Sequence, residues 1–149
     1  MKKKILIGIL IVFIAIQFIR PEKNSGQAVT PTDITHYVQV PDSVMMILRT
    51  SCYDCHSNHT DDLWYREIMP IGWWLNKHVK DGKRHLNFSD FSKYDKKKID
   101  KKLKETAEEV EKKDMPLPSY TLIHTKAKLN SEQIKLIRDW VDTERKKLN

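Results

Sequence analysis

Apolar residues recur at intervals of three and four in two long stretches, and this spacing predicts amphipathic helices. The first helix is expected over 95–113, with Asp95 as its N-cap. The second is expected over 131–147, where Asn130 and Gln133 form a capping box at the start. The apolar positions of the two stretches are Ile99, Leu103, Ala107, Val110, Ile134, Ile137, Trp140 and Val141. Each helix should therefore bury a narrow apolar stripe and expose its lysines and glutamates to water.

Two shorter helices are predicted upstream of these. One begins at Pro41, where the next two residues can act as N-caps, and leads the chain into Cys52. The other lies in an aromatic-rich stretch and is expected over 72–79, after Pro70 and Gly72 have interrupted the chain. A turn at Asp81-Gly82 should end it.

The first 20 residues carry three lysines followed by an apolar run over 5–16. This pattern is typical of a signal sequence or a signal anchor, and the absence of a small-residue cleavage site favours an uncleaved transmembrane helix. The lysines predict a cytoplasmic N-terminus. We therefore expect a single-pass protein of a bacterial inner membrane, whose remaining chain faces the periplasm.

The rest of the chain is expected to form one domain. Residues 21–40 are rich in Pro, Thr, Gly, Ser and Asn, a composition typical of a linker. Residues 41–149 have the length of a single ordinary domain. Glycine is scarce, and alternating β-branched residues are few, so the predicted fold class is all-α.

The formal net charge of +7 does not indicate nucleic-acid binding. Four of the positive charges belong to the first 20 residues, and the other lysines alternate with glutamates rather than with stacking aromatics. No nucleic-acid recognition motif is present, so no nucleic-acid partner is expected.

Cys52-Tyr53-Asp54-Cys55-His56 contains both cysteines of the chain in the spacing C-x-x-C-H. This spacing is the attachment signature of a c-type haem. Two intervening residues allow both thiols to add to the vinyl groups of one porphyrin, and the adjacent imidazole can then bind the iron. Cys52 and Cys55 are thus the predicted thioether anchors of one covalent haem c, and His56 is the predicted proximal ligand.

Three other interpretations of the motif exist. The cysteines can form a redox-active dithiol, a structural disulfide, or half of a zinc site together with His59. A zinc site needs a further Cys or a second well-spaced His. A thioredoxin-like dithiol should follow a strand in a βαβ unit, which the pattern does not contain. The haem interpretation is therefore preferred, and it agrees with the predicted export because covalent haem is attached outside the cytoplasm.

The sixth ligand of the iron is expected to be Met115. It lies between the two long predicted helices, and the prolines at 116 and 118 disfavour helix there and stiffen the loop. His59 is too close to the motif to reach the opposite face of the ring. The competing candidates are Met69, His78, His85 and His124. Nearby, Lys83, Arg84 and His85 are candidate partners of the haem propionates.

The segment from Pro41 to the C-terminus resembles the small bacterial haem-binding domains related to c-type cytochromes, which are often membrane-anchored. The resemblance implies a cytochrome c-like helical fold around one covalent haem, bound through Cys52, Cys55 and His56. Met115 stands where a cytochrome c-like protein places its distal methionine. The motifs that carry the resemblance are SCYDCHSNHT, WYREIMPIGWWLNKHV, DGKRHLNFSDF and MPLPSYTLIH.

Two classes of function follow from these expectations. The first is a membrane-tethered electron carrier with His/Met ligation that exchanges single electrons with a redox partner protein. The second is a haem enzyme or gas sensor with an open sixth site, in which His78 or His85 acts together with Arg84. A third, weaker hypothesis is a subunit that only docks to a larger oxidoreductase.

Overall fold

The computed structural model describes residues 1–61 and 63–148, and within these residues the chain is helical and contains no strand. The predicted all-α class is confirmed. The α-helices cover Lys2–Ile16 (α1), Asp42–Ser51 (α2), Tyr53–His56 (α3), Ile71–His85 (α4), Lys96–Glu111 (α5), Pro118–Thr121 (α6) and Ser131–Leu148 (α7). Short 3-10 helices cover Ile34–His36 (η1), Trp64–Glu67 (η2) and Thr125–Ala127 (η3).

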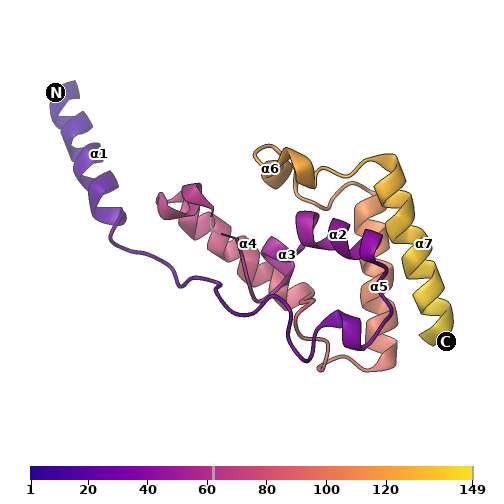
Figure 1. Cartoon of the computed structure of the whole chain (residues 1–149). Helices are drawn as coiled ribbons and strands as arrows, with labels where there is room; N and C mark the ends of the chain where they lie inside the picture. The colour runs from indigo at the N-terminus through magenta and orange to yellow at the C-terminus, as the bar shows by residue number, and fades with distance from the viewer. Residues whose placement is uncertain (62, 149) are drawn as a thin grey trace.

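The helices α5 and α7 lie side by side and run in opposite directions (Figure 1). Both begin at the predicted caps: the Asp95 carboxylate accepts from the Lys98 N–H at 2.7 Å. Asn130 and Gln133 exchange hydrogen bonds of 2.8 and 3.0 Å between side chain and backbone. These caps satisfy backbone N–H groups that a helix start otherwise leaves unpaired.

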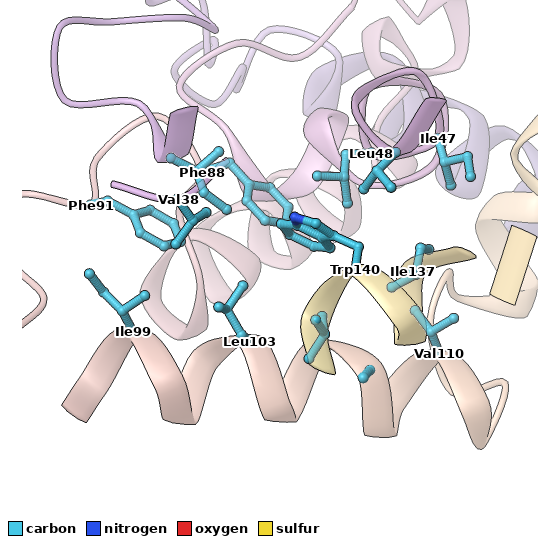
Figure 2. Packing of buried hydrophobic residues seen from close by; sticks show 14 of the residues in the cluster. Val38, Ile47, Leu48, Phe88, Phe91, Ile99, Leu103, Val110, Ile137 and Trp140 are labelled. Atoms are coloured by element: carbon cyan, nitrogen blue, oxygen red, sulfur yellow. The ribbon is translucent and has the colours of Figure 1, made fainter. Parts of the chain in front are cut away.

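The main hydrophobic core lies where the stripes of α5 and α7 meet α2 and the segment before α5 (Figure 2). Trp140 lies at its centre, and its indole N–H donates to the carbonyl of Gln39 at 2.7 Å. Phe88 and Phe91 stack with a centroid separation of 6.4 Å. Full burial of a large apolar side chain contributes about 1.5–3 kcal/mol, so this cluster is a main source of stability.

The prediction of a membrane-spanning N-terminal helix is wrong. The apolar run forms α1, which has 15 residues and projects from the body of the molecule (Figure 1). At 1.5 Å per residue it rises about 22 Å, whereas a bilayer core is about 30 Å thick. Within residues 1–61 and 63–148, no helix is long and apolar enough to cross a membrane. The expected single-pass location in an inner membrane is wrong with it.

The segment 21–40, expected to be a linker, packs against the helices. Asp33 is fully buried and accepts from the hydroxyl of Tyr53, 3.1 Å away. Burial, and after it the negative charge of Asp33, raises the pKa of Tyr53. Ile34 and Val38 belong to the main core. This segment therefore contacts α3 through Tyr53, the residue that follows Cys52.

The helix α4 continues beyond the turn that the sequence predicts at Asp81-Gly82. It extends to His85, and Gly82 lies within its last turns. A Cβ atom placed on Gly82 would come within 2.7 Å of the Cys55 carbonyl oxygen. The glycine therefore permits α4 to cross α3 at close range instead of ending the helix.

Candidate functional site

The motif C-x-x-C-H forms a single helical turn directly after α2. The N–H groups of Cys55 and His56 both donate to the carbonyl of Cys52, at 3.1 and 2.9 Å. Residues three and four apart share one side of such a turn, so the two thiols and the imidazole are grouped together. The backbone thus carries Cys52, Cys55 and His56 on one helical turn, as the predicted attachment to one porphyrin edge expects.

The ring of His56 is held in one orientation. Its Nδ1 lies 3.0 Å from the carbonyl oxygen of Leu86, just beyond the end of α4. Because a carbonyl only accepts, Nδ1 carries the proton and Nε2 keeps the lone pair with which an imidazole binds a metal. Burial lowers the pKa of His56, and this effect outweighs the opposing hydrogen bonds to backbone carbonyls. His56 is therefore a neutral imidazole whose ring is held in one orientation.

The two thiols are half-buried and not joined to each other in the structure. Burial raises the pKa of Cys52 to about 12 and that of Cys55 to about 11. Cys55 packs against a small second cluster of apolar residues, formed by Leu63, Tyr65, Leu75 and Val79. A redox-active dithiol normally has a lowered pKa, so these environments disfavour that alternative.

The alternative of a zinc site also finds no support. The ring of His59 is exposed, and its Nδ1 contacts the carbonyl of Gly26 at 3.1 Å. Among residues 1–61 and 63–148, no three His, Cys, Asp or Glu side chains are grouped closely enough to hold a metal ion. A porphyrin iron is different, because the macrocycle supplies the equatorial ligands and the protein adds only axial ones.

Asp54, a spacer residue of the motif, connects the motif to α6. Its carboxylate accepts from the hydroxyl of Tyr120 at 2.6 Å and from the N–H of Asp61 at 3.0 Å. Tyr120 also stacks on His124, with a centroid separation of 4.3 Å. The other side of His124 is fixed by a 2.8 Å hydrogen bond between its Nε2 and the Tyr65 hydroxyl.

A cavity of about 580 Å³ borders this network. Its lining includes Asp54, Leu63, Tyr120 and His124, and does not include the two thiols or the imidazole of the motif. The cavity thus lies beside the motif, between the end of α2 and residues 120–127. This network was not predicted from the sequence, although the spacing of Tyr120 and His124 at i and i+4 is a signal for it.

The other candidate iron ligands lie in different surroundings. Met115 is half-buried in the loop between α5 and α6, and its N–H donates to the Glu109 carbonyl at 3.2 Å. Met69 is only 1% exposed and contacts Gly72 at the start of α4. His78 bonds the carbonyl of Trp74 at 2.9 Å, and His85 is exposed. The structure thus brings His124 into contact with the residues around the motif, and His85 lies close enough to His56 to contribute to its lowered pKa.

The residues expected to bind propionates are already engaged or exposed. Lys83 donates to the Asn24 side chain at 2.8 Å, and Arg84 pairs with Asp81 at 3.0 Å. The tryptophans of the aromatic-rich stretch do not enter the core either. Trp64 is 72% exposed and Trp74 is 48% exposed. Of the predicted site residues outside the motif, His85 and His124 lie nearest to it.

Replacing Gly82 by alanine tests the contact between α4 and the motif. The added methyl group would meet the Cys55 carbonyl, so we expect a loss of about 1–3 kcal/mol in the free energy of unfolding, as for other overpacked sites. Gly8→Ala is the matched control, because nothing lies within 4 Å of the new methyl group. Urea denaturation of both variants measures the difference. Equal stability of Gly82→Ala and the wild type would contradict close packing here.

Comparison with known proteins adds one match. The family model described as a haem-binding domain matches residues 11–143. No curated protein and no solved structure matches the chain. The matched range contains the motif, α4, the network around Asp54, and both long helices.

Proposed function

Because the chain belongs to the family of haem-binding domains, we propose that it is a monohaem c-type electron carrier. In this proposal one haem is held by thioether bonds to Cys52 and Cys55, and His56 is the proximal iron ligand. The family membership establishes haem binding. The covalent attachment and the electron transfer are the content of the proposal.

The orientation of His56 is the observation that carries the proposal. A ligating imidazole needs a second hydrogen bond that selects its tautomer and directs the free nitrogen. The Leu86 carbonyl supplies this bond at 3.0 Å, beside two unpaired thiols on the same turn. When bound, haem supplies one-electron iron chemistry, and this chain supplies the anchors, the axial base and a low-dielectric surrounding.

The distal ligand in this proposal is Met115. Its loop is flanked by α5 and by α6, and the loop leads within five residues to Tyr120, which is bonded to the motif through Asp54. This connection places the Met115 loop in a segment that docks on the motif. A thioether ligand opposite histidine favours low-spin iron and a raised reduction potential, which suits a carrier.

An optical spectrum of the purified protein tests the proposed function. The reduced protein should show the sharp bands of a low-spin c-type haem, and carbon monoxide should leave them unchanged because both axial positions are filled. Avid binding of carbon monoxide would instead favour an enzyme or gas sensor with an open site. Removal of all haem by acid-acetone would contradict covalent attachment, and a colourless protein would contradict the proposal entirely.

A further inference from the structure

The loop over residues 86–89 holds His56 at two points. The ring Nδ1–H of His56 donates to the carbonyl of Leu86 at 3.0 Å, and the N–H of Phe88 donates to the carbonyl of His56 at 2.7 Å. The ring of Phe88 also meets the imidazole edge to face, with a centroid separation of 6.3 Å. Because a loop has no regular ladder of backbone hydrogen bonds, other groups must keep residues 86–89 in place.

Ser89, the last residue of this loop, is fully buried and bonded through its hydroxyl to two other segments. The hydroxyl accepts from the N–H of Asn58 at 3.0 Å and donates to the carbonyl of Ala28. The N–H of Ser89 donates to the side chain of Asn87 at 3.1 Å. A single hydroxyl therefore joins the loop to the chain just after the motif and to the N-terminal segment.

Residues 28–34 of the N-terminal segment hold the end of the loop through further bonds. The carbonyl of Ser89 accepts from the hydroxyls of Thr30 and Thr32, the second at 3.1 Å. The N–H of Ile34 donates to the carbonyl of Phe88 at 2.8 Å. The part of the chain that composition alone suggests is a linker thus fixes the loop that carries the partner of His56.

The Ser89 hydroxyl has no simple substitute in this arrangement. Removing it would take one partner from the N–H of Asn58 and one from the carbonyl of Ala28, and both bonds lie in the part-buried interior. A polar group that stays buried without its partner keeps the cost of its lost hydration. The loop would therefore move more freely, and the carbonyl of Leu86 moves with it.

We propose that Ser89 is a positioning residue for the haem ligand His56, an inference that rests on the proposed function. Its hydroxyl fixes the loop, and the loop fixes the bond between the ring Nδ1–H and the carbonyl of Leu86. A firm bond at Nδ1 makes a ligating imidazole more basic. A more basic ligand favours ferric over ferrous iron, so Ser89 keeps the reduction potential lower than it would otherwise be.

The first test measures the bond of the His56 ring directly. NMR of the full-length, reduced protein follows the exchange of the Nδ1 proton with solvent. In Ser89→Ala we expect this exchange to be about 2- to 10-fold faster, the factor that loss of one ordinary hydrogen bond gives. Ser92→Ala is the matched control, because Ser92 is exposed and its hydroxyl donates only to Asp90, at 2.7 Å. Equal exchange in Ser89→Ala and the wild type would overturn the proposal.

The reduction potential separates positioning from a general loosening of the fold. A weaker bond at Nδ1 makes the imidazole less basic, so Ser89→Ala should raise the potential. Entry of water around the haem would act in the opposite direction, because water stabilises the more highly charged ferric form. A potential that falls or stays unchanged in Ser89→Ala would therefore contradict the proposal, and Ser92→Ala should keep the wild-type value.

Thr32→Val provides a milder variant that tests the same link if Ser89→Ala does not fold. It removes one donor to the Ser89 carbonyl and nearly preserves the shape of the side chain. Both measurements should shift in the same direction as in Ser89→Ala, by a smaller amount, and wild-type values in both would overturn the proposal. If the purified wild type contains no haem, the proposed function has failed, and the exchange of the Nδ1 proton still decides whether Ser89 holds the ring of His56.

Discussion

The double variant Cys52→Ala/Cys55→Ala is expected to lose covalently bound haem completely. Each thioether depends on one of these thiols, and the chain contains no other cysteine. The single variants should each retain one possible bond and show a weakened signal. Denaturing gels stained for haem peroxidase activity measure the effect, because only covalent haem stays with the unfolded chain.

The control for these variants is Thr50→Ala. Thr50 lies two residues before the motif, is exposed, and donates only to the Met46 carbonyl of its own helix at 2.9 Å. Its removal should leave the haem stain at the wild-type level. A stain that survives in the double variant would show that the haem is attached elsewhere, and the assignment of Cys52 and Cys55 would be wrong.

Met115→Ala is expected to convert low-spin iron into a high-spin or water-ligated form. The variant removes the proposed thioether ligand from a half-buried loop and leaves His56 in place. Carbon monoxide should then bind the reduced protein readily, whereas it should not bind the wild type. Optical spectra of the oxidised and reduced protein, with and without carbon monoxide, measure both effects.

Two variants compare the competing ligands. Met69→Ala should leave the spectrum nearly unchanged but cost about 2–5 kcal/mol in the free energy of unfolding, because Met69 is only 1% exposed. His124→Ala should break the bond to Tyr65 and keep low-spin iron. If His124→Ala rather than Met115→Ala opens the site, the ligation is bis-histidine. A wild-type spectrum in Met115→Ala would remove the basis for the proposed His/Met carrier.

Several features of this protein could be predicted from local patterns alone. The stripe along 95–113 and the capping box at Asn130 and Gln133 depend on residues within a few positions of each other. The C-x-x-C-H motif is equally local, since it consists of five consecutive residues. The lysine-first apolar run is a local pattern too, but the membrane span inferred from it is wrong, because α1 has only 15 residues.

The sequence by itself thus determined the helical class, the long helices and their caps, and the C-x-x-C-H motif. Only the tertiary structure decided what surrounds that motif. Tyr120 reaches Asp54 from 66 residues away, and Leu86 orients His56 from 30 residues away. Such contacts depend on how the helices pack against one another. This packing results from many weak interactions between residues far apart in the sequence, so no local sequence pattern predicts it.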